Sequence, residues 1–189
     1  PSTRTRVSFD VGVRQLGGHA ITLYEHEVGL GKREPIKDVA RVLSRYLDMV
    51  MIRTFKHNDL ELFASYATIP VINGLTDSAH PCQALADFMT IKDHFSDLSQ
   101  LKIAYLGDGN NVCRSLVALA HVMGVEMVIS NPTSFELKID IPVTRVSDPK
   151  AAVAGAHVVY TDTWISMGED TTDKPTRLLS RFSPYQVNS

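Results

Sequence analysis

The stretch that decides the fold is LKIAYLGDGNNVCRSLVALAHVMGVEMVIS, residues 101–130. Its first part, residues 101–106, has the apolar run of a buried strand, and residues 107–111 form a tight polar loop. Residues 112–123 have helical spacing, and residues 125–129 indicate a second strand. A strand, a helix and a strand in this order form a βαβ unit with parallel strands and a right-handed crossover. The sequence therefore predicts an α/β fold.

The rest of the chain alternates between helical and strand patterns in the same way. Pro35 and Pro81 each stand at the first position of a helical pattern, where proline fits best. Glycines and mixed charges in residues 25–34 predict a mobile loop. We expect helices over 5–16, 35–47, 58–66, 81–94 and 151–154, and strands over 19–24, 49–52, 71–72 and 157–161. We place a domain boundary between residues 97 and 98, which gives domains 1–97 and 98–189.

The composition excludes several classes of protein. Of the 189 residues, 44% are hydrophobic and 21% are charged, as in an ordinary globular protein. The net charge is −2 without a basic stripe, which argues against a nucleic-acid partner. Two cysteines fit a reducing compartment, so we expect a cytoplasmic protein, and no apolar run approaches the roughly 20 residues of a membrane span. The chain opens with Pro1 rather than Met, so we expect the natural start to lie upstream.

The strongest local signal is STRTR, residues 2–6, at the start of a helix. Hydroxyls, backbone N–H groups, the helix dipole and guanidinium forks converge there, and a phosphate dianion suits such a site. The same residues also fit a plain Ser/Thr cap followed by two solvated arginines. These five residues alone favour neither interpretation.

Further polar residues follow strand ends, where open parallel sheets bind ligands. Arg53 follows the strand at 49–52, and His80 and Gln83 follow the strand at 71–72. His80 could donate to a carbonyl oxygen and Gln83 could hold an amide, although a lone histidine here is more often a helix cap. Cys82 fits a small packing residue better than a nucleophile, because no base is marked beside it.

The loop GDGNN, residues 107–111, invites a dinucleotide-binding interpretation that fails. Val112 occupies the place of the third glycine, and the second strand ends without the acidic residue that grips a ribose. Asn110 or Asn111 would instead present an amide to a small polar ligand.

The last polar cluster is DTWISMG, residues 162–168, which leaves another strand end. Its acid, hydroxyl and glycine could hold the ammonium and carboxylate of an amino acid, or they could be an ordinary loop exit. Trp164 fits packing better than recognition. The histidines are scattered without HExxH or CxxC spacing, so we expect no metal.

Together these segments resemble the aspartate/ornithine carbamoyltransferase family, and its ornithine branch most closely. The match occurs in family order and spans nearly the whole chain. The matching segments are 2–9 (STRTRVSF), 33–43 (REPIKDVARVL), 73–77 (NGLTD), 80–83 (HPCQ), 107–111 (GDGNN) and 162–168 (DTWISMG). The first and fourth are shared across carbamoyltransferases, and the Ser-Met-Gly segment marks the ornithine branch.

The resemblance implies a role for each matching position. Residues implied to bind the phosphate of carbamoyl phosphate are Ser2, Thr3, Arg4, Thr5 and Arg53. Residues implied to hold and polarise its carbamoyl group, and so to be catalytic, are Arg53, His80 and Gln83, with help from Thr5. Residues implied to bind L-ornithine are Asn111, Asp162, Ser166 and Met167.

The resemblance also implies the architecture and the reaction. The family builds two domains, each a parallel sheet flanked by helices, with the active site in the interdomain cleft, and it assembles as homotrimers or multiples of them. Residues 1–97 would be the carbamoyl-phosphate-binding domain and 98–189 the ornithine-binding domain. The implied reaction carbamoylates the δ-amine of ornithine to give citrulline and phosphate in arginine biosynthesis, with no cofactor or metal.

Departures from the family pattern temper these expectations. The chain lacks both family ends, including the His-Cys-Leu-Pro segment that helps to orient ornithine, so we expect this polypeptide to be impaired as a catalyst. Gly29 replaces the usual Gln or His, which puts one carbamoyl phosphate contact in doubt. Residues 131–148 are shorter than usual by about one helix.

Two alternatives remain open at this point. One is a sibling carbamoyltransferase that uses putrescine, N-acetylornithine or aspartate. The other is an inactive fragment of the family that only binds carbamoyl phosphate or a partner subunit.

Overall fold

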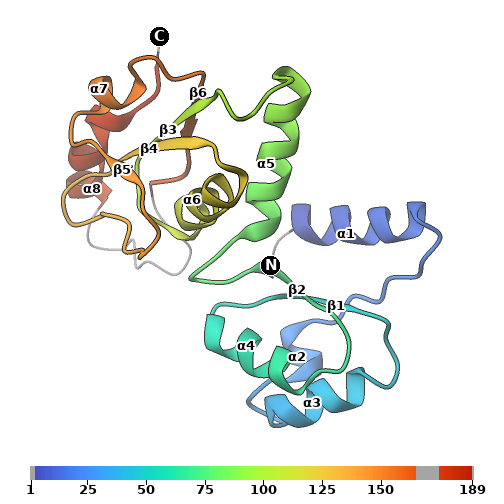
Figure 1. Cartoon of the computed structure of the whole chain (residues 1–189). Helices are drawn as coiled ribbons and strands as arrows, with labels where there is room; N and C mark the ends of the chain where they lie inside the picture. The colour runs from blue at the N-terminus through green and yellow to red at the C-terminus, as the bar shows by residue number, and fades with distance from the viewer. Residues whose placement is uncertain (1–2, 165–174, 189) are drawn as a thin grey trace. The chain divides into compact units, whose positions relative to one another are not determined.

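The computed structural model describes residues 3–164 and 175–188. By packing, the chain divides into two compact units, residues 1–74 and 75–189. Each unit combines helices with hydrogen-bonded strands, as predicted for an α/β protein (Figure 1). The sequence-based domains 1–97 and 98–189 stay a prediction beside this division.

The predicted βαβ unit forms the centre of the second unit. It comprises β3 (Lys102–Leu106), α6 (Asn111–Met123) and β4 (Glu126–Ser130). The two strands pair in parallel along their whole length, with Tyr105 opposite Ile129. The predicted parallel pair is therefore confirmed.

Two further strands extend this sheet to four, in the order β5-β4-β3-β6. The strand β6 (Val158–Thr161) pairs with β3 in parallel, and the two-residue β5 (Thr144–Arg145) pairs with β4 in parallel. The short helix α7 (Pro149–Val153) lies between β5 and β6 in the chain, and the side chain of Asp148 caps it. The sequence did not predict β5, because two exposed residues show no apolar pattern.

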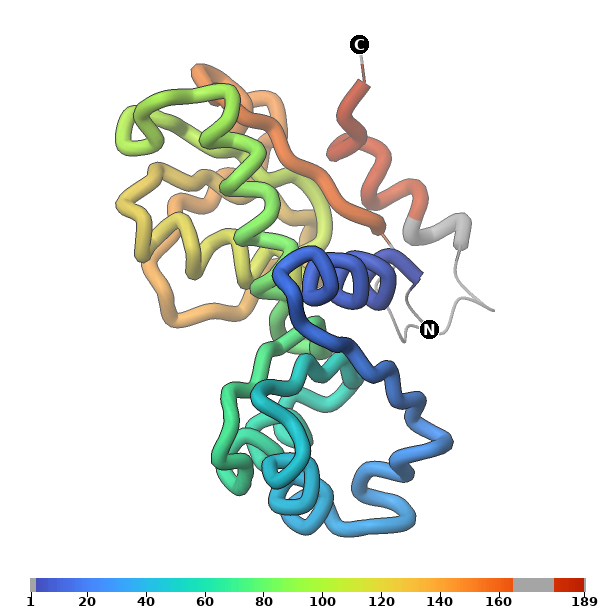
Figure 2. Tube along the Cα trace, turned by 90° about the vertical axis from the view of Figure 1, so that its right-hand side faces the viewer, coloured from blue at the N-terminus to red at the C-terminus, as the bar shows by residue number. Residues whose placement is uncertain are grey.

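The core of the second unit lies between the sheet and two helices. Buried side chains of the strands, among them Tyr105 and Ile129, pack against Leu116 of α6 and Phe88 of α5 (Pro81–His94). The helices α5 and α6 lie side by side in both views (Figures 1 and 2). The predicted long helix opened by Pro81 is confirmed.

The first unit holds a smaller core around a pair of strands. Its elements are α1 (Thr3–Gln15), α2 (Glu25–Val28), α3 (Ile36–Leu43), β1 (Val50–Arg53), α4 (His57–Tyr66) and β2 (Val71–Leu75). Ile36, Val39 and Ala40 of α3 pack against Phe63 of α4, and partly buried strand residues cover them. A Cβ on Gly74 would lie 2.4 Å from the sulfur of Met51, so the strands approach too closely there for any larger residue.

Three local predictions in this unit are wrong. Residues 19–24 form no strand, because among the described residues none pairs with them, and Ile21 stays 64% exposed. The predicted loop 25–34 contains the short helix α2. The helix from Pro35 ends at Leu43 rather than at residue 47, and Tyr46 is 80% exposed. Alternation alone cannot supply the hydrogen-bonding partner that a strand needs.

In the second unit, α8 (Pro175–Phe182) and the 3-10 turn Ser183–Tyr185 were not predicted from the sequence. Phe182 at the end of α8 is fully buried. Its ring packs against Phe135 at a centroid distance of 4.8 Å. This aromatic contact, rather than any periodic pattern, holds the end of α8 on the unit.

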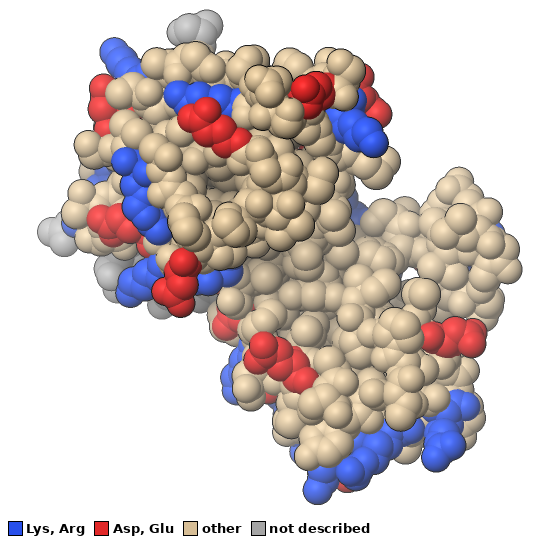
Figure 3. Space-filling model, viewed as in Figure 1, with Lys and Arg blue, Asp and Glu red and all other residues tan. Residues whose placement is uncertain are grey.

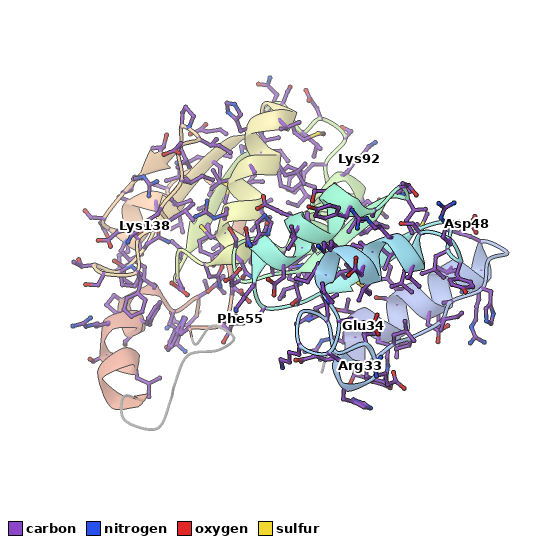
Figure 4. All side chains as sticks on the ribbon, turned by 90° about the horizontal axis from the view of Figure 1, so that it is seen from below. Arg33, Glu34, Asp48, Phe55, Lys92 and Lys138 are labelled. Carbon is purple, nitrogen blue, oxygen red and sulfur yellow. The ribbon has the colours of Figure 1, made fainter. Side chains whose placement is uncertain are left out.

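Charged residues lie on the outside of both units. On the face drawn in Figure 3, basic side chains gather over the α3 end of the first unit, whereas both signs alternate over the second unit. Arg33 and Glu34 project from the loop before α3 (Figure 4) and form an exposed pair at 3.4 Å. Exposed pairs of this kind add little stability.

Candidate functional site

The first group of candidate residues joins the start of α1 to the end of β1. Arg53, the last residue of β1, donates a hydrogen bond from Nη1 to Oγ1 of Thr5 at 2.8 Å. The two residues are 48 positions apart in the chain, so only the fold brings them together. Burial lowers the pKa of the half-buried Arg53, but guanidinium stays charged at any physiological pH. The result is a cation held at the N-terminal end of a 13-residue helix.

The neighbours of Thr5 in the STRTR motif differ in what they do. Thr3 and Arg4 lie in the first turn of α1 and are exposed. Arg6 donates a hydrogen bond to the hydroxyl of Tyr24, and its guanidinium lies 5.7 Å from the centre of that ring. Ser2 lies outside the described residues. Backbone N–H groups of a first helical turn, two hydroxyls and Arg53 suit an anion such as phosphate.

In the second unit, His80 stands at the N-cap position of α5, and its side chain makes no capping hydrogen bond. Its backbone N–H donates to Oγ of Ser115 at 2.7 Å, and this hydroxyl donates to the carbonyl of Asn111 at 2.9 Å. These two hydrogen bonds tie the start of α5 to the first turn of α6, so the position of His80 is fixed from two helices. The role of its side chain stays a prediction.

Gln83 lies in the first turn of α5 and is held by an acidic neighbour. Its Nε2 donates to Oδ1 of Asp87 at 3.0 Å, and the hydroxyl of Tyr160 donates to Oδ2 of the same carboxylate at 2.9 Å. Burial and the bond to Asp87 raise the pKa of Tyr160, so the phenol remains a donor. The sequence analysis missed Asp87 and Tyr160. The four-residue spacing of Gln83 and Asp87 on a helix was the available signal.

Asn110 organises the loop after β3. Its Oδ1 accepts hydrogen bonds from the backbone N–H groups of Val112 and Cys113, both at 3.0 Å, which caps α6. Its Nδ2 donates to Oδ2 of Asp162 at 2.9 Å. Asn110 therefore serves as a cap and fixes the candidate acid, a double role that sequence reasoning missed.

Asn111 is oriented by a different partner. Its Nδ2 donates to the carbonyl of Thr76 at 2.6 Å, so its amide oxygen faces the opposite way. An outward amide oxygen and the carboxylate of Asp162 are both acceptors, which suits a ligand that carries an ammonium group. Of the other candidates, Ser166 and Met167 lie outside the described residues. Trp164 stacks on buried Phe182 with centroids 5.8 Å apart, which fits its predicted packing role.

The cysteines show no sign of activation. Burial raises the pKa of the Cys113 thiol, which is fully buried, and burial also raises the pKa of Cys82. Among the described residues, no cluster of three or more His, Cys, Asp or Glu side chains could hold a metal ion. Within the same part of the chain, no helix has the length and apolar character to cross a bilayer.

Two sequence profiles of one family match consecutive parts of the chain. The carbamoyl-P binding domain of aspartate/ornithine carbamoyltransferase matches residues 1–93. The Asp/Orn binding domain of the same family matches residues 99–189. Together the two matches cover nearly every residue, in the order in which the family arranges its domains.

Curated relatives and solved structures agree with these profiles. The chain is 46% identical to the ornithine carbamoyltransferase of Methanocaldococcus jannaschii and 48% identical to that of Archaeoglobus fulgidus, over 100% of its length. It spans 66% and 64% of those two proteins. The structure resembles that of ornithine carbamoyltransferase from Pyrococcus furiosus with a TM-score of 0.93 at 43% identity, over 100% of this chain and 64% of the other. For the Thermus thermophilus enzyme the TM-score is 0.89 at 40% identity, over 100% and 63%.

Proposed function

This chain belongs to the aspartate/ornithine carbamoyltransferase family, and we propose that its protein transfers the carbamoyl group of carbamoyl phosphate to the δ-amine of L-ornithine. The products would be L-citrulline and phosphate. The observation that carries the proposal is the hydrogen bond between Arg53 and Thr5, because it places a fixed cation at the start of α1. The names of the relatives, at 46% to 48% identity, support ornithine as the amine.

In the proposed scheme, residues of the first unit take the phosphate. Thr3, Arg4 and Thr5, with Ser2, would offer hydroxyl, guanidinium and backbone N–H donors, and Arg53 would add a fork of N–H groups. A dianion gains from both the helix end and the guanidinium. This part of the scheme predicts that phosphate itself binds weakly.

In the same scheme, residues of the second unit bind the carbamoyl group and ornithine. His80 would donate to the carbamoyl oxygen and Gln83 would accept from the carbamoyl N–H₂. Asn111 and Asp162, with Ser166 and Met167, would bind ornithine. The hydrogen bond from Asn110 supports the role of Asp162, because it fixes an acid that can receive an ammonium group. The same acid disfavours aspartate, whose side-chain carboxylate it would repel.

The chemistry follows from where charge develops. The neutral δ-amine attacks the carbamoyl carbon with its lone pair, and a tetrahedral intermediate forms with negative charge on the former carbonyl oxygen. The C–O bond to phosphate then breaks, phosphate leaves with that electron pair, and the amine nitrogen loses a proton. In the proposed scheme the donors to this oxyanion would be Arg53 and His80, and donors in such a role typically contribute about 3 kcal/mol each. Residues that hold both substrates in register contribute much of the rest.

A binding experiment tests the proposal without requiring turnover. Thermal denaturation is followed with carbamoyl phosphate, with norvaline (an ornithine analogue without the δ-amine), and with both. We expect carbamoyl phosphate to raise the melting temperature and norvaline to raise it further. Stabilisation by carbamoyl phosphate alone would support the binding fragment instead. If putrescine, N-acetylornithine or aspartate competed with norvaline for binding and ornithine did not, the result would support a sibling carbamoyltransferase.

The matched variants are Arg53→Ala and Arg45→Ala. Loss of a charge-assisted hydrogen bond costs about 2 kcal/mol, so Arg53→Ala should weaken carbamoyl phosphate binding about 30-fold. Arg45 is exposed just after α3, and its removal should leave the affinity unchanged. Equal affinities of both variants and the wild type would overturn the proposal.

We also propose the cellular setting that goes with this reaction. The protein would act in the cytoplasm as a homotrimer or a multiple of it, in arginine biosynthesis. Both cysteines are reduced thiols, which supports a reducing compartment. Size-exclusion chromatography with light scattering tests the oligomer.

A further inference from the structure

Gln83 stands at one end of a hydrogen-bonded chain, centred on Asp87, that its proposed role does not require. Its amide nitrogen donates to Oδ1 of Asp87, and Oδ2 of Asp87 accepts from Tyr160. Each carboxylate oxygen thus receives one donor. A carboxylate can only accept, so its neighbour must present the amide nitrogen and not the amide oxygen. Asp87 therefore determines which way round the amide of Gln83 lies.

The partners of Asp87 are themselves held in place. Asp87 follows Gln83 by four residues on α5, and the buried residues Ala84 and Phe88 fix this helix on the core. Tyr160 lies on β6 directly opposite Tyr105 of β3 in the parallel register. The two rings stack with centroids 5.7 Å apart at an angle of 18°. The network therefore has a rigid base on both sides.

Tyr105 completes the arrangement. It is fully buried, and its hydroxyl donates to the carbonyl of Asp108 at 2.8 Å. Burial raises the pKa of Tyr105 as well as that of Tyr160, so both phenols stay protonated and neither can become a competing anion beside Asp87. The order of donation, from Tyr160 and Gln83 to Asp87, holds across the neutral range.

We propose that Asp87 and Tyr160 are positioning residues that turn the amide oxygen of Gln83 outward and so make the site select a ligand with an N–H₂ group over an isostere without one. The proposal rests on the proposed function, in which Gln83 meets the carbamoyl nitrogen. It adds the reason why Gln83 accepts there rather than donates: its own donor is already engaged by Asp87. Without that engagement, the amide could rotate and offer N–H groups to the ligand's N–H₂, where no hydrogen bond can form.

Two stable ligands that differ only at this point provide the test. Phosphonoacetamide ends in C(=O)NH₂, and 2-oxopropylphosphonate ends in C(=O)CH₃. Their affinities for the full chain are measured by titration calorimetry, with inorganic phosphate as a third ligand. The wild type should prefer the amide about tenfold, the range of one hydrogen bond. Gln83→Ala should abolish the preference and leave the affinity for the ketone unchanged.

Substitution of Asp87 or Tyr160 should change only the preference for the amide ligand over the ketone ligand. Asp87→Ala should reduce it to about twofold and Tyr160→Phe to about fourfold, with unchanged affinities for the ketone and for phosphate. In the Gln83→Ala background neither change should have any further effect on the ratio. Asp93→Ala on the exposed part of α5 and Tyr46→Phe are the matched controls and should keep the tenfold ratio.

The outcomes separate the two proposals. If Gln83→Ala loses the preference while Asp87→Ala and Tyr160→Phe keep it, the positioning roles are wrong and the proposed function stands. An equal loss of all three ligands in folded Tyr160→Phe would mean a merely structural role and would also overturn the inference. If the wild type binds neither phosphonate nor phosphate, the proposed function fails and the inference fails with it. Should Asp87→Ala not fold, Tyr160→Phe alone decides, because it removes one oxygen from an otherwise unchanged ring.

Discussion

The two units hold their candidate site residues by different means. In the second unit, Gln83 hydrogen-bonds to Asp87 on its own helix, and Asn110 hydrogen-bonds to Asp162 across 52 positions of the chain, around one buried sheet. In the first unit, Thr5 and Arg53 meet across a hydrogen bond, but Thr5 belongs to α1, a fully described helix in which no residue is buried. The contrast indicates that substitutions in the second unit change stability first, whereas those in the first unit change ligand affinity first.

The largest effect tests the core of the second unit. Leu116→Ala removes a fully buried side chain of α6 and should lower the free energy of unfolding by about 3 kcal/mol, through lost burial and the cavity left behind. Val11→Ala on α1, where the side chain is 45% exposed, should change it by less than about 0.5 kcal/mol. Urea denaturation measures both. Comparable losses for the two variants would break the contrast.

A smaller effect concerns the loop after β3. Asn110→Ala removes the cap of α6 and the partner of Asp162, and we expect a loss of about 2 kcal/mol in unfolding free energy. Asn58→Ala, at an exposed position in α4, is the control and should be nearly neutral. If Asn110→Ala weakened ligand binding without a loss of stability, the second unit would behave as we expect of the first.

The pH dependence sharpens the same point. Burial raises the pKa of Cys113 above its usual value of about 9, so its neutral thiol adds stability that is complete below pH 9 and declines as the pH rises above it. Between pH 9 and 10 the unfolding free energy should fall by about 1 kcal/mol. Cys113→Ala should flatten this slope. An unchanged slope in the variant would show that the thiol contributes nothing to it.

The smallest effect lies in the first unit. Thr5→Val keeps the shape of the side chain but removes the oxygen that Arg53 contacts. We expect carbamoyl phosphate to bind about fivefold more weakly, with an unfolding free energy within about 0.5 kcal/mol of the wild type. Thr22→Val, at an exposed position outside the helices, should alter neither quantity. A large loss of stability in Thr5→Val would mean that α1 is held as firmly as the sheet.

The sequence predicted the βαβ core well because its strands and helix are buried and carry unbroken apolar patterns. Residues 101–129 show this most clearly, since the ends of the predicted elements differ from those of β3, α6 and β4 by no more than one residue. It failed where an element depends on a distant partner. Residues 19–24 alternate like a strand without pairing as one, and β5 pairs without alternating.

The same limit applies to the candidate site. The motif residues were visible as polar side chains after predicted strands, and the family resemblance ranked them. Their partners were not visible, because Tyr160 reaches Asp87 across 73 positions of the chain and Asp162 reaches Asn110 across 52. The pairing of β6 with β3, together with the packing of α5 on the same core, brings those residues within hydrogen-bonding distance.

By itself, then, the sequence determined the secondary structure of the central βαβ unit and supplied the candidate site residues, because both depend on local pattern and residue type. The tertiary structure decided which way those side chains are turned: the amide of Asn111 and the guanidinium of Arg53 take their orientation from groups 35 and 48 positions away in the chain. The orientation of a polar side chain depends on its hydrogen-bonding partner, and a sequence pattern does not show which residue that partner is.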